Sequence, residues 1–509
     1  MPQCAYPADS REGRRKEASI PRGLNGRTFI STAIRGHGHR RGTAMALEET
    51  HRRIDREWSS HLSDTRKLLR IPSVSLTGEG IQETAEFLGD MIAELGVKPG
   101  FYKGTRKSHP LVTGYLDAEA EKTALLYGMY DVQPIGDINE WKYPPFGATI
   151  VRKKPYGEIL INRGAYNSKA SLGGTLLAIK TMLDDGDMPL NIHFLLEGEE
   201  EQGGLSLPKY VEKNKAKLSK ADVAFGFDYM ENAKGVPVIS LGLKGCVYFD
   251  LICEGTTRGG PTAEVHSSDA VWIESPVWRL VHAISTMVDE NQKPVVDGLW
   301  DDVVGPNKDD LELVKKLAMT FNTANYLDEI SVKRFKEEGT KEELLNKYLF
   351  EPSINIDGLS AGFEEDGTKT VLPPRAKAKI DIRLVPNMTI EGTRKKVMEH
   401  LKRRGFTDIT MRNYIDYPWS KVSPHEGISR ATVEAMRYHG KEPEVWPTSA
   451  GSAPFYLFDQ VLGVPWGGAG LGHGGNAHSP NEFVVVKGMK EFEKSVVTTF
   501  WKFVDIASR

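Results

Sequence analysis

Three adjacent acidic side chains follow a short apolar segment in the first half of the sequence. Residues 191–196 have the composition of a buried strand, and Glu197-Gly198 is followed by Glu199, Glu200 and Glu201. Carboxylates this close repel one another, so they need a cation, a proton or solvent beside them. A solvated acidic loop has the same composition. The position at the end of an apolar strand favours a site, because sites in α/β sheets gather where strands end.

Helical and extended segments alternate on either side of this run. Apolar periodicity predicts helices at residues 54–71, 87–96, 172–183, 428–438 and 486–504. Strands are predicted at residues 123–127, 191–196 and 222–228, and a hairpin at residues 147–161. Alternation of this kind is typical of an α/β sheet. Asp228 ends the third of these strands, so it also lies where a site is expected.

The pattern changes at about residue 240. Residues 246–253 and 376–385 read as strands, and residues 311–348 as a long helical stretch. The α/β pattern resumes near Pro418, which predicts a second, α+β domain inserted into the first. The predicted divisions are residues 45–240 and 418–509 for the two parts of the first domain, and residues 241–417 for the insertion.

Composition narrows the functional class. The 509 residues carry a formal net charge of −3, which argues against nucleic acid as a partner. No apolar run is long enough to span a membrane. Cys4, Cys246 and Cys253 cannot form a disulfide framework, so we expect a cytoplasmic location. Residues 1–44, rich in Arg, Gly and His, are predicted to be a disordered or mis-annotated N-terminal extension.

Several segments together resemble, in sequence order, the co-catalytic zinc metallopeptidases of the carnosinase, acetylornithine deacetylase and carboxypeptidase G type. The matching segments are residues 128–134, Trp141, residues 144–146, residues 163–165, residues 197–201, Asp228, residues 265–267, residues 382–387, residues 449–452 and residues 477–482. The resemblance implies a zinc-peptidase-like catalytic domain, a mixed sheet flanked by helices, with an inserted α+β lid that often forms a homodimer. It also implies two divalent metals, usually zinc, and hydrolysis of an amide.

The resemblance implies a role for each matching residue. Glu200 matches the proton shuttle, Glu201 and His478 match ligands of one metal, and Asp228 matches a ligand of the other. Asp131 matches a residue that orients a metal-binding histidine. On the substrate side, the matching residues are the lid histidine His266, the carboxylate-pairing arginine Arg383 and a glycine/serine loop at Ser449, Gly451 and Ser452.

Two positions depart from the pattern. Met129 stands where the family has a metal-binding histidine, and Asn167 stands where it has the bridging aspartate. A neutral thioether is a poor zinc ligand beside carboxylates. A neutral amide cannot neutralise two cations as a bridging carboxylate does. We therefore expect that a normal two-metal centre does not form.

Three alternatives follow for the site. One metal could bind Glu201 and His478, completed by Asp228, water or His473, although a loop histidine bound to backbone is the more common role for a residue such as His473. The site could instead be metal-free, with Glu200 as general base and Tyr166 and Lys169 as electrophilic helpers. The third alternative is a binding protein without catalysis.

The sequence thus predicts a hydrolase that cleaves an amide or peptide-like C–N bond in a small carboxylate-bearing substrate. Its cofactor is either one divalent metal, zinc or manganese, or none. We expect a homodimer formed through the lid, and neither nucleic acid nor membrane as a partner. The alternative function is a catalytically silent family member that binds a dipeptide-like ligand or serves as an assembly subunit.

Overall fold

The computed structural model describes residues 43–414 and 416–508, so the predicted extension lies outside the described residues except at its last two positions. The helices are α1 (Thr43–Arg70), α2 (Ile81–Glu94), α3 (Lys169–Asp184), α4 (Ser206–Leu218), α5 (Pro276–Ser285), α6 (Lys308–Thr320), α7 (Thr323–Glu329), α8 (Lys341–Phe350), α9 (Ile390–Arg403), α10 (Gly427–Tyr438) and α11 (Val486–Ala507). Among these described helices, none is long and apolar enough to cross a membrane.

A six-stranded mixed sheet carries the acidic run. In spatial order its strands are β1 (Gly100–Tyr102), β2 (Leu111–Leu116), β6 (Leu190–Glu197), β3 (Lys122–Met129), β7 (Val223–Gly226) and β18 (Trp466–Gly467). The strands from β6 to β18 are parallel, and β1 and β2 pair antiparallel. All eight residues of β6 are buried, which requires cover on both faces of the sheet. The parallel strands therefore end together at one edge.

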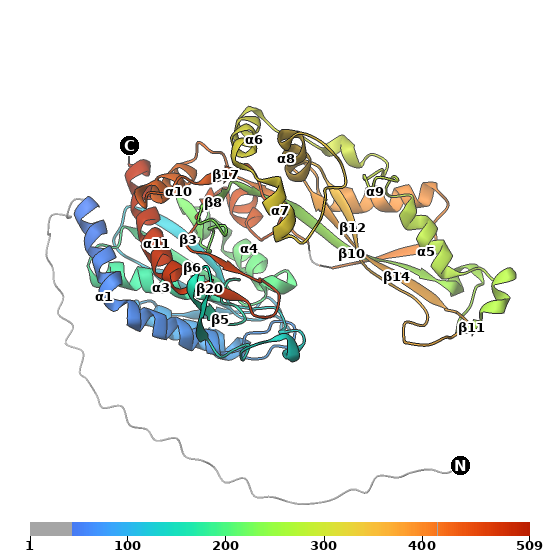
Figure 1. Ribbon diagram of the computed structural model, residues 1–509, viewed down its shortest axis with the longest axis horizontal. Coiled ribbons are helices and arrows are strands. Elements are labelled where there is room, and N and C mark those ends of the chain that lie inside the picture. Colours follow the sequence, from blue (N-terminus) through green and yellow to red (C-terminus); the bar gives the residue numbers. More distant parts are fainter. Residues whose placement is uncertain (1–42, 415, 509) are drawn as a thin grey trace, which may run out of the picture. The chain divides into compact units, whose positions relative to one another are not determined.

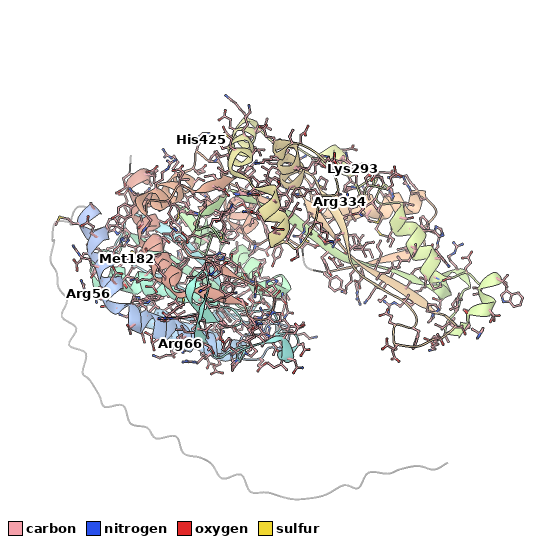
Figure 2. The ribbon with its side chains drawn as sticks, in the orientation of Figure 1. Arg56, Arg66, Met182, Lys293, Arg334 and His425 are labelled. Atoms are coloured by element: carbon pink, nitrogen blue, oxygen red, sulfur yellow. The ribbon has the colours of Figure 1, made fainter. Side chains whose placement is uncertain are left out.

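Helices from both ends of the sequence pack around this sheet (Figure 1). Helices α1, α3 and α11 contact one another, and α10 contacts α11, whereas α4 contacts β6. Met182 of α3, labelled in Figure 2, is fully buried in the largest hydrophobic core. Arg66 of α1, also labelled there, donates through Nε to the carbonyl oxygen of Ala148 at 3.0 Å. This hydrogen bond ties the first helix to the start of the predicted hairpin.

A second sheet brings the C-terminal segment beside that hairpin. Its strands, in order, are β19 (Gly474–Gly475), β20 (Phe483–Val485), β5 (Gly157–Ile161) and β4 (Thr149–Lys153). Because β20 pairs with β5, the loop between β19 and β20 lies close to the segment that leads from β5 into α3. This pairing places His478 beside Asn167.

The inserted part has its own sheet and its own core. Its four antiparallel strands, in order, are β12 (Ser353–Ser360), β14 (Arg375–Leu384), β10 (Gly245–Glu254) and β15 (Ile409–Asn413). Helices α5 and α9 contact this sheet, and buried residues of the sheet and of these two helices belong to a separate hydrophobic cluster. The predicted fold class, an α/β catalytic domain with an inserted α+β lid, is confirmed. The numerical domain boundaries stay predictions.

Short pairings join the remaining strands. They are β8 (Val238–Ser240) with β17 (Glu444–Trp446), β9 (Gly242–Leu243) with β16 (Ser420–Lys421), and β11 (Val265–His266) with β13 (Val371–Leu372). The helical stretch predicted at residues 311–348 corresponds to the three helices α6, α7 and α8. Asn322 caps α7 and Thr340 caps α8, and each cap starts a new helix.

Candidate active site

The acidic turn after β6 is fixed by hydrogen bonds from its own backbone. The backbone nitrogens of Glu200 and Glu201 each donate to one carboxylate oxygen of Asp131, both at 3.0 Å. Asp131 follows the neighbouring strand β3 and is fully buried. Its carboxylate therefore joins the ends of two strands and shapes the turn that presents both glutamates.

Glu199 turns away from the two acids that follow it. Its buried carboxylate accepts hydrogen bonds from three backbone nitrogens, those of His109 at 2.9 Å, Leu205 at 2.9 Å and Ser206 at 2.6 Å. These contacts anchor the start of α4. Only Glu200 and Glu201 face the site. The electrostatic repulsion expected among three adjacent carboxylates is therefore limited, at the site, to these two.

A cavity of about 970 Å³ opens at this edge of the sheet. Its volume lies in the range of small-molecule sites. From the catalytic part it is lined by Met129, Asn167, Glu200, Glu201, Asp228 and His478. From the lid and the segment that follows it, the lining includes Arg383, Tyr417 and Ser452. The structure thus brings together most of the residues that the resemblance singled out.

Burial raises the pKa of several carboxyl groups around this cavity. The pKa of Glu200 is raised well above its ordinary value, first by burial and then by the negative charges of Glu201 and Asp131. Burial is also the largest cause for Asp131, whose pKa rises to about 7, for Glu197, to about 8, and for Asp228, to about 6. The raised pKa values of Asp131, Glu197 and Asp228 therefore lie close to neutral pH.

The loop that carries Asn167 is held by a buried ion pair. Arg163 and Glu482 are each 1% exposed, and Nη1 of the arginine lies 2.7 Å from Oε2 of the glutamate. The same carboxylate accepts hydrogen bonds from the backbone nitrogens of Gly164 at 3.1 Å, Tyr166 at 2.8 Å and Asn167 at 2.9 Å. Four donors thus converge on Glu482, which fixes the backbone on which Asn167 stands.

Asn167 contacts two of the expected metal ligands. Its Nδ2 lies 2.7 Å from Oε1 of Glu201 and 2.8 Å from Nε2 of His478. Nε2 of His478 is also 3.1 Å from the same oxygen of Glu201, and this contact raises the histidine pKa. Gln133, a residue that sequence reasoning gave no role, donates to the other oxygen of Glu201 at 2.9 Å.

The side chains at this site do not fit the two-metal centre that the resemblance implies. Met129 supplies a thioether at the end of β3, and Asn167 supplies a neutral amide whose nitrogen faces the ligands. Within residues 43–414 and 416–508, no group of three or more His, Cys, Asp or Glu side chains is arranged to hold a metal ion. Asp228 accepts instead from the hydroxyl of Ser171 at 2.7 Å.

The lid contributes the cationic side chain of Arg383 to the cavity lining. Nη1 of Arg383, on β14, donates to Oγ of Ser452 at 3.0 Å, and its Nε donates to Asp381 at 2.9 Å. A guanidinium has five N–H donors, of which these contacts use two. Ser449 and Gly451 do not line the cavity. Oγ of Ser449 accepts from the backbone nitrogen of Gly451 at 3.2 Å and closes the turn before Ser452.

Two predicted histidines lie outside the cavity lining. His266, at the end of β11, is exposed, and its two ring nitrogens contact Thr370 at 2.9 Å and Ser268 at 2.8 Å. Nδ1 of His473 lies 3.0 Å from the carbonyl oxygen of Glu231, so this histidine is bound to backbone. This contact is the one expected of a loop histidine, and the metal-binding reading of His473 stays a prediction.

Lys169 is also absent from the cavity lining. Its ammonium group is buried, donates to the carbonyl oxygen of Ile71 and lies 3.0 Å from the hydroxyl of Ser73. Burial lowers its pKa to about 7. Tyr417 does line the cavity, and its hydroxyl donates to the carbonyl oxygen of Glu200 at 3.1 Å. No sequence signal marked Tyr417, because it lies between the predicted domains and outside every motif.

The comparisons with known proteins agree with this fold. Residues 125–501 match the sequence profile of Peptidase family M20/M25/M40. The chain belongs to this family. It is 34% identical to the M20 family metallo-carboxypeptidase Sso-CP2 from Sulfolobus solfataricus, whose structure superposes with a TM-score of 0.81 over 87% of this chain and 99% of that one.

Two curated relatives are dipeptidases. The chain is 27% identical to the Cys-Gly metallodipeptidase dug1 of Schizosaccharomyces pombe over 482 residues, which cover 88% of this chain and 97% of that protein. It is 32% identical to the Beta-Ala-His dipeptidase of Homo sapiens over 297 residues, which cover 58% of this chain and 56% of that protein. The chain is a member of a family of hydrolases that act on peptide bonds.

Proposed function

We propose that this protein hydrolyses an amide or peptide C–N bond in a small substrate that carries a carboxylate. One observation carries the proposal. The same cavity is lined by Glu200 and Glu201 of the catalytic part and by Arg383 of the lid, which is hydrogen-bonded to Ser452. A guanidinium binds a carboxylate in a directed way, and an acid in the same cavity can transfer a proton. The relatives named as Cys-Gly and Beta-Ala-His dipeptidases act on small substrates that carry a carboxylate, which supports a similar substrate for this chain.

Glu200 is proposed as the general base that activates water and then returns the proton to the leaving amine. Arg383 holds the substrate carboxylate, with Ser452 beside it. Glu201, Asp228 and His478 hold either one divalent metal, zinc or manganese, or a polar water site. The arrangement of their side chains favours the water site, because amide and hydroxyl donors of the chain already contact them.

We also propose a homodimer formed through the lid. His266 is exposed and does not line the cavity of its own chain. Close to it in sequence, Val271 and Trp272 are 81% and 78% exposed, which is unusual for large apolar side chains. A second copy on this surface would cover them and bring His266 to a second cavity.

Two further proposals concern location and organisation. Cys246 and Cys253 are both free thiols, which supports a reducing cytoplasm. The two largest hydrophobic clusters are separate, which supports the division at residues 241–417 and the two-part catalytic domain.

Glu200→Gln tests the function directly. The full chain is assayed by mass spectrometry against a panel of dipeptides and N-acyl amino acids, with and without a chelator. Glu212→Gln, on an exposed position of α4, is the matched control. We expect turnover by the wild type and the control and its loss in Glu200→Gln. Turnover that survives in Glu200→Gln would contradict the role of Glu200, and a wild type inactive on the whole panel would contradict the proposed hydrolysis.

The substitutions at Met129 and Asn167 favour a second candidate, a catalytically silent protein that binds a dipeptide-like ligand or serves as an assembly subunit. In that case the wild type and Glu200→Gln both bind a dipeptide without cleaving it. Isothermal titration with the same panel separates this outcome from hydrolysis.

A further inference from the structure

Asn167 occupies the space between two side chains that would otherwise share a cation. Its Nδ2 is within 2.7 Å of Oε1 of Glu201 and within 2.8 Å of Nε2 of His478. A primary amide has two N–H donors, and here two acceptors lie within hydrogen-bond distance of one nitrogen. A cation bound by the same two side chains would have to displace that amide.

The hydrogen-bond network defines the orientation of the amide. Oδ1 of Asn167 lies 3.0 Å from the hydroxyl of Ser168, which donates to it. With the amide reversed, Oδ1 would face the carboxylate of Glu201 at 2.7 Å, and two acceptors would repel each other. With the nitrogen toward Glu201, the amide donates to the carboxylate and can also donate to Nε2 of a neutral His478.

The lone pair on Nε2 of His478 is engaged in either protonation state. In the neutral ring with its proton on Nδ1, Nε2 accepts from Asn167. In the protonated ring, Nε2 carries a proton and donates to Glu201 at 3.1 Å. A metal needs this lone pair, and neither state offers it.

The remaining carboxylate oxygens are met by donors in the same way. Oε2 of Glu201 accepts from Nε2 of Gln133 at 2.9 Å. Oδ1 of Asp228 accepts from the hydroxyl of Ser171 at 2.7 Å. Each expected ligand therefore has a neutral donor of the same chain within hydrogen-bond distance, and Met129 at the next position adds no oxygen or nitrogen ligand.

We propose that these amide and hydroxyl donors take the place of divalent cations, with Asn167 as the central substitute, so that the folded protein is stable without a bound metal. The donors are neutral, whereas two cations would require carboxylate ligands to balance their charge. This inference rests on the hydrogen bonds alone and holds whether or not the protein hydrolyses a peptide.

The test measures metal content and thermal unfolding of the full chain, with no substrate present. Wild type, the double variant Met129→His with Asn167→Asp, and the control Asn291→Asp are treated with chelator, dialysed, and then supplied with zinc or manganese. Asn291 is exposed in a turn, so the control adds the same charge away from the cavity. Elemental mass spectrometry gives cations per chain, and scanning fluorimetry gives the unfolding midpoint.

We expect substoichiometric metal in the wild type and the control, with midpoints that do not change on chelation or metal addition. In the double variant, the Asn167→Asp substitution replaces two N–H donors by a second carboxylate near Glu201, so the chelated form should unfold at a lower temperature. Added zinc should bind stoichiometrically and shift its midpoint upward, because a ligand that binds only the folded state stabilises it.

Two outcomes overturn the proposal. The first is a wild type that holds one or more cations per chain and loses thermal stability when they are removed. The second is a double variant that gains no cation, because Asn167 and Met129 would then not be what excludes the metal. If the double variant does not fold without metal, it can be expressed with zinc and its metal content measured. The metal content and thermal stability of the wild type then still test the proposal. Since no turnover is measured, a negative result here is distinct from failure of the proposed hydrolysis.

Discussion

Replacing Glu482 by glutamine should destabilise the protein strongly although Glu482 lies outside the cavity lining. Its carboxylate accepts from the side chain of Arg163 at 2.7 Å and from three backbone nitrogens. Glutamine keeps one acceptor oxygen, but its amide group would point hydrogens at groups that are themselves donors. It also leaves the buried guanidinium without a counter-charge.

The magnitude follows from the burial of the pair. Removing one partner of a buried ion pair costs about 3 to 5 kcal/mol, because the remaining charge stays buried without compensation. An exposed pair of similar geometry provides the comparison. Arg437 and Glu442 also approach to 2.7 Å, but their side chains are 49% and 70% exposed. Glu442→Gln should therefore cost less than about 1 kcal/mol.

The assay combines urea unfolding, followed by tryptophan fluorescence, with hydrogen exchange. Loss of the acceptor should speed exchange of the amides of Gly164, Tyr166 and Asn167, which donate to Glu482. The matched variant Glu442→Gln should leave this segment protected. A Glu482→Gln protein within about 1 kcal/mol of the wild type, with exchange unchanged, would refute the reasoning that this pair holds the loop.

Three other predictions follow from the structure. A Cβ at Gly198 would lie 2.3 Å from the hydroxyl oxygen of Tyr130, so Gly198→Ala should displace the acidic turn and lower the thermal midpoint; an unchanged midpoint would show that the turn can adjust. Burial lowers the pKa of both His51 and His439 to about 4, so the unfolded chain binds protons at higher pH than the folded one. The free energy of unfolding should therefore fall as pH falls from about 6.5 toward 4, by at most about 1.4 kcal/mol per pH unit for each histidine. In the double variant His51→Gln with His439→Gln, urea unfolding at a series of pH values should show a weaker dependence of this free energy on pH. Arg383→Lys should raise KM roughly tenfold for carboxylate substrates with little change in kcat, and equal KM values for the two proteins would remove the arginine from substrate binding.

Local patterns in the sequence predicted the catalytic fold well. The strand expected at residues 191–196 is β6 (Leu190–Glu197), and the helix expected at residues 172–183 is α3 (Lys169–Asp184). Both have apolar residues at a regular spacing, and such spacing is a property of the segment itself. The helical stretch expected at residues 311–348 consists of three helices, and the capping side chains Asn322 and Thr340 mark where the second and third begin.

Only those residues of the candidate site that belong to sequence motifs could be predicted. Glu200, Glu201 and Asp228 follow strands that end at one edge, so their approach follows from the sheet. The contact of Gln133 with Glu201 depends on how two loops meet, and no periodicity encodes it. The sequence also does not show which way the Asn167 amide faces, and in the structure its nitrogen donates to Glu201.

The pairing of β20 with β5 has a consequence for how the protein is made. Arg163 and Glu482 are 319 positions apart in the sequence, and the whole lid is synthesised between them. At translation speeds of 5–20 residues per second, the arginine loop waits roughly 15 to 60 s for its partner. During this interval β7, which later pairs with β18, is an open sheet edge. The nascent chain therefore passes through a period in which it is vulnerable to aggregation, and slower elongation through the lid would lengthen that period.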